Sequence, residues 1–352
     1  MTTAAGPAGL DAAAVEAWLG EQVPLTGRPA WSLLAGGRSN LSYLLEVAVG
    51  SAAGDVQRYV LRRPPLGHVQ ATAHDMAREH RVQAALAGTG VPVPRMIGVC
   101  EDADVAGAPF YVMEFVPGAV VRTPGDAALL DAAGREAAAH SLVDTLAVLH
   151  DVDPAAAGLA GFGRPEGFPE RQVRRWWRQF EGSRSREVPG VADLHGALAA
   201  TVPGQGRATV VHGDYRLDNV VLGEHGEVRA VLDWEMATLG DPRADLGLLL
   251  AYWDGLGGGP GGVAPAPGLV PGPGSGFPAG STLVQRYASR SGGDVDRLGW
   301  FTALGYFKIA VILEGIHRRH ALGRTVGEGF EGIGALVAPL VAAGLRTMDE
   351  GI

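Results

Sequence analysis

Two residue types are almost missing from this sequence of 352 residues. Its one cysteine, Cys100, excludes an internal disulfide and a cluster of thiolate metal ligands, as is usual for a protein of the reducing cytoplasm. A buried strand thiol is its simplest role. Lysine also occurs once, as Lys308, so arginine has to supply nearly every other positive charge.

Long hydrophobic runs are missing as well. The longest uncharged stretch follows Asp254 and is rich in Gly and Pro, so it does not have the composition of a membrane-spanning helix. Near the N-terminus Asp11, Glu16 and Glu21 precede the first arginine, Arg28, unlike the basic start of a signal peptide. We therefore expect a cytoplasmic protein without a membrane partner.

Positive charge is in the minority. The formal net charge is −9, which gives the whole molecule no attraction for phosphate backbones, so we expect no nucleic-acid partner. The hydrophobic content of 47% is enough for a full core in one large two-lobed domain or in two ordinary ones. The sequence leaves the oligomeric state open.

Residues 1–117 are predicted to form mostly sheet. Three short strands, ending at Gly36-Gly37, spanning 41–49 and spanning 57–63, read as an antiparallel meander. A helix is predicted over 72–87 from its apolar spacing, and two further strands over 93–100 and 110–115. Pro117-Gly118 then ends this N-lobe.

Residues 118–352 are predicted to be mainly helical. The helices are expected over 130–150, 166–182, 190–200, 242–253, 281–291, 295–321 and 327–346, with a small β island of strands at 208–211, 219–222 and 228–232. Residues 254–281 hold 11 Gly and 6 Pro, which predicts a flexible surface insertion. The layout is that of an α+β, two-lobed, protein-kinase-like fold, although order of elements alone is a weak argument for function.

The β island carries the strongest chemical signal. One strand leads into Asp214, Asn219 follows five residues later, and another strand ends on Asp233. Phosphoryl transfer from ATP needs such a set: a carboxylate that accepts the proton of the substrate hydroxyl, and an amide and a carboxylate that hold Mg²⁺. Each residue alone could be a turn former at a strand end. Together they favour a kinase.

The motif His-Gly-Asp-x-x-x-x-Asn at 212–219, with Asp-Trp-Glu at 233–235, resembles the aminoglycoside phosphotransferase and choline kinase family. This resemblance extends from Gly36 to about Arg319. It implies that Asp214 is the catalytic base, that Asn219 and Asp233 bind Mg²⁺, and that His212 supports the loop.

A further acidic residue, Asp245, follows in Gly-Asp-Pro-Arg-Ala-Asp at 240–245. The family uses an acidic residue here to brace the catalytic loop. The same segment can also be explained as a helix start, with Asp241 as N-cap and Pro242 in the first turn.

The N-lobe is expected to bind the nucleotide. Kinases place a lysine at the end of the third strand to pair the ATP phosphates, and here the choice is Arg62 or, on the opposite strand face, Arg63. The expected partner of this arginine is Glu79, which could instead be an exposed helical glutamate. Gly36-Gly37 could likewise be a simple hairpin turn. Nucleotide contacts are expected from Gly37, Arg38, Ser39, Asn40, Arg62, Glu79, Glu114 and Val116.

Several segments, among them Leu-Asp-Trp-Glu-Met-Ala-Thr-Leu-Gly-Asp-Pro at 232–242, are similar to the kinase domains found beside acyl-CoA dehydrogenases. This branch implies a hydroxyacyl-CoA or hydroxy acid as the small-molecule acceptor. Arginines also outnumber acids over 164–186, which would repel a polycationic aminoglycoside. Candidate acceptor residues are Arg175, Lys308, Glu314 and Arg318; a solvated arginine face and a surface ion pair of Lys308 are the alternatives.

Other functions are also compatible with this sequence. An aminoglycoside or amino-alcohol kinase would use the same catalytic set, and a kinase fold without catalysis could act as a binding module. A protein kinase is disfavoured because only seven residues separate Asp233 from Asp241, too few for an activation segment. ATP and Mg²⁺ are the expected cofactors.

Overall fold

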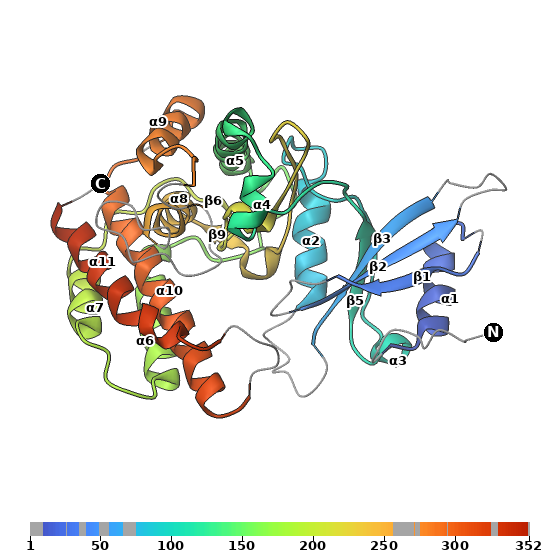
Figure 1. Cartoon of the computed structure of the whole chain (residues 1–352), viewed down its shortest axis with the longest axis horizontal. Helices are drawn as coiled ribbons and strands as arrows, with labels where there is room; N and C mark the ends of the chain where they lie inside the picture. Colours follow the sequence, from blue (N-terminus) through green and yellow to red (C-terminus); the bar gives the residue numbers. More distant parts are fainter. Residues whose placement is uncertain are drawn as a thin grey trace. The chain divides into compact units, whose positions relative to one another are not determined.

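The computed structural model describes residues 10–25, 27–34, 40–48, 56–65, 75–255, 271, 275–293, 295–324 and 330–350. Its internal contacts divide the chain into two compact units (Figure 1). The N-terminal unit comprises Met1–Pro117 and Ala230–Glu235, and the C-terminal unit comprises Gly118–Arg229 and Met236–Ile352. The short segment Ala230–Glu235, which includes Asp233, therefore belongs with residues more than a hundred positions earlier in the sequence.

A five-stranded antiparallel sheet forms the N-terminal unit. Its strands lie in the order β1-β2-β3-β5-β4, so the predicted meander of the first three strands is confirmed. The bounds are β1 Ala30–Leu33, β2 Leu41–Ala48, β3 Val56–Arg63, β4 Met96–Cys100 and β5 Phe110–Glu114. Leu41 pairs with Arg63, which sets the register between β2 and β3.

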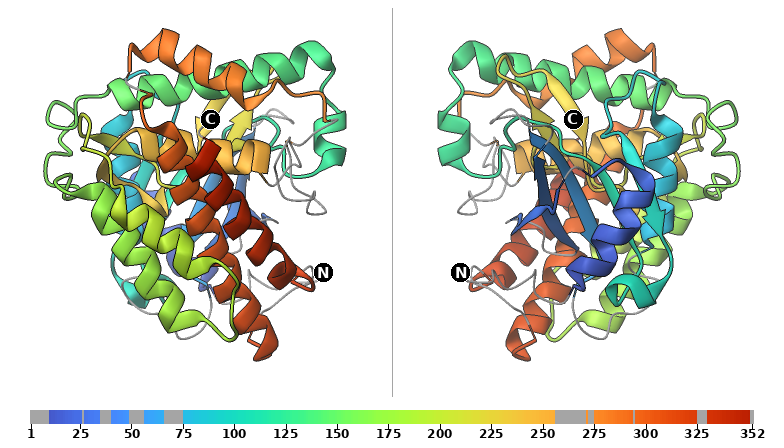
Figure 2. Two further views of the ribbon diagram at one scale, coloured as in Figure 1. Left: turned by 90° about the vertical axis from the view of Figure 1, so that its left-hand side faces the viewer. Right: turned by 90° about the vertical axis from the view of Figure 1, so that its right-hand side faces the viewer.

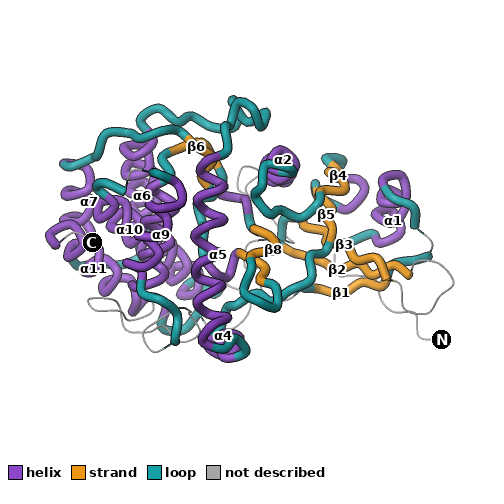
Figure 3. The backbone as a smooth tube through the Cα atoms, turned by 90° about the horizontal axis from the view of Figure 1, so that it is seen from above, coloured by secondary structure: helices purple, strands orange, loops and turns teal. Residues whose placement is uncertain are grey.

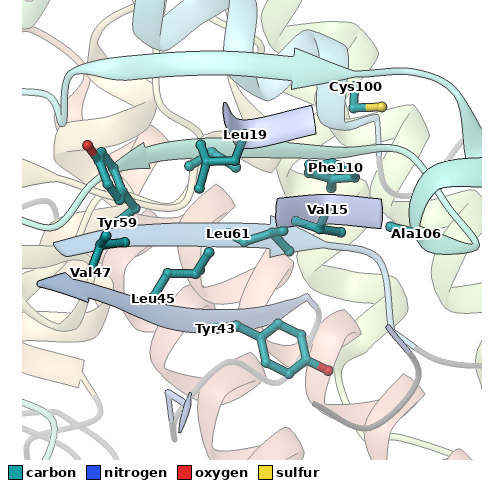
Figure 4. Packing of buried hydrophobic residues seen from close by; sticks show 11 residues of the cluster. Val15, Leu19, Tyr43, Leu45, Val47, Tyr59, Leu61, Cys100, Ala106 and Phe110 are labelled. Atoms are coloured by element: carbon teal, nitrogen blue, oxygen red, sulfur yellow. The ribbon is translucent and has the colours of Figure 1, made fainter. Parts of the chain in front are cut away.

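Helices cover both faces of this sheet. On one face α1 (Ala12–Gln22), a helix missing from the sequence prediction, buries Val15 and Leu19 against Leu45, Leu61 and other strand residues (Figure 4). The Asp11 carboxylate caps α1 by accepting hydrogen bonds from the Ala13 and Ala14 amides.

The predicted helix is α2 (Met76–Leu86), capped by Asp75. It places Met76 against Val60, Tyr111 and Met113 on the sheet's other face. A further short helix, α3 (Ala103–Ala106), lies between β4 and β5.

The C-terminal unit is mainly helical, as predicted. Its helices are α4 Pro124–Ala128, α5 Ala132–Asp151, α6 Phe168–Ser183, α7 Val191–Ala200, α8 Arg243–Leu250, α9 Gly280–Ser291, α10 Leu298–Ala321 and α11 Val337–Glu350. Helix α11 packs along α10 (Figure 2), and α9 lies beside α5 (Figure 3). Arg286 and Arg290 of α9 both donate hydrogen bonds to the Asp144 carboxylate of α5, each at 2.7 Å.

The β island contains two small sheets. Strand β6 (Thr209–Val211) pairs antiparallel with β9 (Thr238–Gly240), a three-residue strand that was not predicted, and β7 (Val220–Leu222) pairs with β8 (Val228–Val231). Because a three-residue strand has almost no sequence pattern of its own, its pairing partner defines it.

The predicted insertion at 254–281 is only partly described. Residues 256–270 and 272–274, where its flexibility was predicted, lie outside the described residues. At its ends the Trp253 indole donates to the Pro278 carbonyl at 2.8 Å, and the Gly280 amide donates to the Asp254 carboxylate at 3.3 Å. The two ends of the insertion are thus tied together.

Helix α10 is the central helix of the C-terminal unit. Among the described residues it is the one helix long and apolar enough by composition to cross a membrane, but 78% of its apolar window is buried inside the protein. It contacts α6, α7, α8 and α11. Its apolar composition is therefore explained by core packing.

Glycine permits the close approach of α8 to α10, which gives a stability prediction. A Cβ at Gly247 would lie 2.5 Å from the Phe301 carbonyl carbon, so Gly247→Ala should lower the free energy of unfolding by about 1–3 kcal/mol. Gly196 on α7 is exposed, and a Cβ there would meet no neighbouring group within 4 Å. Gly196→Ala should therefore raise the free energy of unfolding by roughly 0.5–1 kcal/mol. Urea unfolding measures both, and equal effects would contradict this packing.

Candidate active site

The catalytic loop begins where β6 ends. His212, Gly213 and Asp214 follow the strand directly, and a single 3₁₀ turn, Leu217–Asn219, returns the chain to β7. The Asn219 amide nitrogen donates to the Asp214 backbone carbonyl at 2.8 Å and to the Asp214 carboxylate at 3.1 Å. The predicted base and one predicted metal ligand are therefore adjacent, and the Asn219 amide oxygen remains as a hard donor of the kind that Mg²⁺ binds.

Asp245 braces this loop from the first turn of α8. Its fully buried carboxylate accepts hydrogen bonds from the His212 amide at 2.6 Å and the Gly213 amide at 2.8 Å. Burial would raise the pKa of Asp245, but the contact with His150 at 3.3 Å and the backbone donors outweigh it and lower the pKa. His150 contacts the Tyr287 hydroxyl at 2.8 Å on its other side. At the start of α8 the N-cap position is held by Pro242, and the Asp241 carboxylate just before it accepts from the Arg243 amide at 3.0 Å.

Gly213 needs its lack of a side chain. Its φ is +82°, and a Cβ there would lie 2.6 Å from the Met236 carbonyl oxygen. The Asp214 amide then donates to Nδ1 of the buried His212 at 3.2 Å. His212 thus contacts the backbone of the predicted base, at the position where the family resemblance expected a supporting residue.

Lys308 reaches the same loop from the middle of α10. Its side chain is 8% exposed and its ammonium donates to the Gly213 carbonyl, so the alternative of a surface ion pair is wrong. The Trp176 ring of α6 lies beside it, 5.3 Å from Nζ to the ring centroid. Burial lowers the pKa of Lys308 to about 8, against the opposing charges of Asp214 and Asp245.

The other three acceptor candidates lie at or near the C-terminal unit's helix α6. The exposed Arg175 places its guanidinium 5.3 Å from the Trp176 ring centroid, on the residue that Lys308 also contacts. Arg318 donates to the Gly182 carbonyl at 2.6 Å. Glu314 is fully buried and binds Ser185 and Arg186. The structure thus groups Arg175 with Lys308, whereas Arg318 and Glu314 hold the end of α6 and the segment after it.

A buried polar cluster occupies the N-terminal unit. Arg62 of β3 donates to Glu79 of α2 at 3.0 Å and to Asp233 at 2.5 Å. Asn40 donates to Glu79 at 3.1 Å and to Glu235 at 3.2 Å. Burial raises the pKa of Glu79 and the neighbouring Arg62 opposes the rise. Glu79 is therefore a buried ion-pair partner, and the alternative of an exposed helical glutamate is wrong.

Arg63 points the other way. Its guanidinium donates to the Ala106 carbonyl at 2.7 Å, away from Glu79 and Asp233. The strand alternation thus separates the two arginines, and Arg62 is the one that lies in the polar cluster. Asp233 itself has a φ of +64°, a conformation uncommon for residues other than glycine that clusters at functional sites.

The remaining predicted nucleotide residues are only partly placed. Gly37, Arg38 and Ser39 lie outside the described residues. Exposed Glu114 pairs with Arg95 at 3.1 Å, and its amide donates to the Arg95 carbonyl at 2.9 Å. Val116 is half-buried, and in the described part of the chain its amide has no backbone acceptor. Of these two backbone amides, that of Glu114 is thus occupied, and that of Val116 has no backbone acceptor among the described residues.

Sequence reasoning did not select Arg216 or Tyr252. Arg216 lies two residues after Asp214, and its Nε is 3.6 Å from the Asp214 carboxylate and 2.8 Å from that of Asp218. Its guanidinium carbon lies 4.6 Å from the centroid of the Tyr252 ring. An arginine inside the catalytic motif was a visible signal, whereas the Tyr252 contact spans 36 positions and required the fold.

Known proteins resemble this chain in sequence. The sequence profile of the Phosphotransferase enzyme family matches residues 30–264. Acyl-CoA dehydrogenase family member 10 of Mus musculus is 34% identical over 297 residues, which cover 82% of this chain and 26% of the relative. Acyl-CoA dehydrogenase family member 11 of Homo sapiens is 33% identical over 357 residues, which cover 96% of this chain and 43% of the relative. The chain spans about a quarter to two fifths of the length of these relatives.

Solved structures support the same assignment. A Ralstonia eutropha protein assigned as an aminoglycoside phosphotransferase is 31% identical, with a TM-score of 0.78 and coverage of 97% of this chain and 99% of the other. A second structure is a thermostable mutant of aminoglycoside phosphotransferase APH(4)-Ia, crystallised with AMP-PNP and hygromycin B. It is 15% identical, with a TM-score of 0.61 and coverage of 96% of this chain and 99% of the other, and it supports the fold. The predicted protein-kinase-like fold is thus confirmed. Because the family profile and these relatives match most of its length, the chain belongs to the phosphotransferase enzyme family, in the branch shared with acyl-CoA dehydrogenase family members 10 and 11.

Proposed function

We propose that this phosphotransferase moves the γ-phosphate of Mg-ATP to a hydroxyl of a small molecule, with Asp214 as the base. The acceptor oxygen attacks the γ-phosphorus, the bond from that phosphorus to the ADP oxygen breaks, and Asp214 takes the hydroxyl proton. One observation carries the proposal: Asp214 lies against Asn219 in a loop whose backbone is held by the buried Asp245. Catalysis of this kind depends on such positioning.

We assign the nucleotide and metal contacts as follows. Asn219 and Asp233 supply oxygen donors, the hard ligands that suit Mg²⁺. Among the described residues no group of three His, Cys, Asp or Glu side chains could hold a metal, which fits an ion that keeps water and phosphate oxygens as its other ligands. When bound, Mg²⁺ would neutralise charge on the transferred phosphate. Arg62, oriented by Glu79, would pair the ATP phosphates, and Val116 would contact adenine. Gly37, Arg38, Ser39, Asn40 and Glu114 are further proposed nucleotide contacts.

For the acceptor we propose a hydroxyacyl-CoA or a hydroxy acid. The acyl-CoA dehydrogenase relatives support this class, and so does the positive charge that Lys308 and Arg175 place around Trp176. A polycationic aminoglycoside would be repelled there. Glu314 and Arg318 would act on the acceptor by holding the segment after α6 in place.

An aminoglycoside or amino-alcohol kinase is the second candidate. The structural neighbours include complexes with hygromycin B and kanamycin, which favours it by fold alone. A binding module without catalysis is disfavoured because Asp214, Asn219 and Asp233 are all present. The single, buried Cys100 supports a cytoplasmic location.

A ligand panel tests the acceptor assignment. The protein would be heated with a non-hydrolysable ATP analogue, Mg²⁺ and single members of a set of hydroxyacyl-CoA thioesters, hydroxy acids, amino alcohols and aminoglycosides. Because a ligand that binds the native state raises Tm, the acidic or thioester acceptors should raise it and should release ADP with real ATP. Stabilisation and turnover only with the cationic compounds would overturn the proposed acceptor class and leave the kinase assignment standing.

A further inference from the structure

The peptide group that joins Gly213 to Asp214 is hydrogen-bonded at both ends. On one side its N–H, carried by Asp214, donates to Nδ1 of His212 at 3.2 Å. On the other side its C=O, carried by Gly213, accepts from the Lys308 ammonium. A peptide unit is planar, so two such contacts fix its rotation. The direction in which the Asp214 side chain leaves the backbone is constrained with it.

The nature of residue 308 is itself informative. Of the 29 lysine and arginine residues in the sequence, this is the only lysine, and arginine occupies even position 62, where kinases place a lysine. Arginine carries a planar fork with five donors, whereas lysine carries a compact point charge. At 8% exposure, between the Trp176 ring and a backbone carbonyl, position 308 suits the smaller head group.

The charges that face Lys308 come from three other elements. Asp214 and Arg216 lie in the catalytic loop, Asp245 lies on α8 and Arg175 lies on α6. The two carboxylates favour the charged ammonium, and the two arginines oppose it together with burial. Burying a cation costs free energy unless it is compensated, and here the Gly213 carbonyl and the two carboxylates compensate it.

We propose that Lys308 is a positioning residue for phosphoryl transfer: with His212 it clamps the Gly213–Asp214 peptide and thereby aims the carboxylate of the base. The inference rests on the proposed function, because it assigns Lys308 a part in aligning Asp214. Lys308 acts through the backbone of the loop, and its replacement should therefore change turnover more than ATP binding.

The kinetic test compares Lys308→Met, which keeps length and removes the charge, with Arg178→Met. Arg178 is an exposed arginine of α6, so this control also removes one positive charge. Misalignment of a catalytic group costs about 10²-fold, so Lys308→Met should lower kcat about 10²-fold with less than about a twofold change in the KM for ATP. Arg178→Met should match the wild type.

A pH profile separates positioning from a merely structural role. The Lys308 amine is charged below about pH 8 and loses its proton above it. The wild-type kcat should therefore fall as the pH rises through about 8, and Lys308→Met should lack this fall. Lys308→Arg, which stays charged throughout, should also lack it. An unchanged alkaline limb in Lys308→Met would overturn the inference.

A second measurement does not depend on the acceptor. Deuterium uptake of residues 212–219 should rise in Lys308→Met relative to the wild type and to Arg178→Met, because one end of the clamp is lost. Unchanged uptake together with a normal kcat would overturn the role of Lys308. A wild-type enzyme that transfers no phosphate would instead contradict the proposed function, while the uptake result still decides the clamp. If Lys308→Met does not fold, Lys308→Gln takes its place in both measurements.

Discussion

Replacing Asp214 by Asn should lower kcat by about 10²–10⁴-fold while ATP affinity stays within about twofold of the wild type. The amide has the shape of the carboxylate and can still accept from Asn219, which now donates to the Asp214 carboxylate at 3.1 Å. It cannot take a proton from the acceptor hydroxyl, so the loss is confined to the chemical step. Steady-state kinetics and calorimetric titration with Mg-ATP measure the two quantities.

Asp218→Asn is the matched control for this prediction. Asp218 is another carboxylate of the same loop, and it pairs with Arg216 at 2.8 Å. Its replacement changes the same functional group four residues away and should cost far less activity than Asp214→Asn. Full activity of Asp214→Asn, or a larger loss in Asp218→Asn, would show that the base has been assigned to the wrong residue.

The second large effect is expected at Arg62. Arg62→Met leaves Glu79 in the core without its cation, and breaking a buried ion pair in this way costs about 3–5 kcal/mol of stability. The same substitution removes the proposed phosphate-pairing charge, so ATP binding should weaken as well. Arg62→Lys should recover part of both losses, because it restores the charge but cannot bridge Glu79 and Asp233 with a rigid fork.

Arg58→Met on the same strand provides the control. Arg58 pairs with Glu46 at 2.8 Å, but both side chains are exposed, and a surface pair of this kind contributes about 0–1 kcal/mol. Urea unfolding should therefore show a large loss for Arg62→Met and a small one for Arg58→Met. Equal losses, or unchanged ATP affinity in a folded Arg62→Met protein, would contradict the role given to Arg62.

Local sequence features predicted the parts of this protein that depend on neighbours in the chain. The catalytic motif fixes Asp214 and Asn219 within one loop, and strand alternation placed Arg62 and Arg63 on opposite faces of β3 before their contacts were known. The helix α1 was missed because its alanine-rich stretch buries only Val15 and Leu19, too few for a clear apolar period.

Contacts between residues far apart in the sequence could not be predicted from it. Lys308 and Gly213 are 95 positions apart, and nothing in the apolar segment around Lys308 indicates that its ammonium reaches the catalytic loop. A charged residue on a long helix is most often exposed, which favoured the surface ion pair. The buried environment of Glu314 was hidden for the same reason, since Ser185 and Arg186 come from a different part of the chain.

Phosphorus NMR of the reaction mixture tests the central claim, phosphoryl transfer with Asp214 as the base, most directly. Wild-type protein, Mg-ATP and the acceptor that raises Tm most should give the resonances of ADP and of one new phosphomonoester, and Asp214→Asn should give neither on the same timescale. Equal product from the variant would contradict the role of Asp214, and a wild-type protein that binds no Mg-ATP and forms no product with any acceptor would contradict the kinase itself.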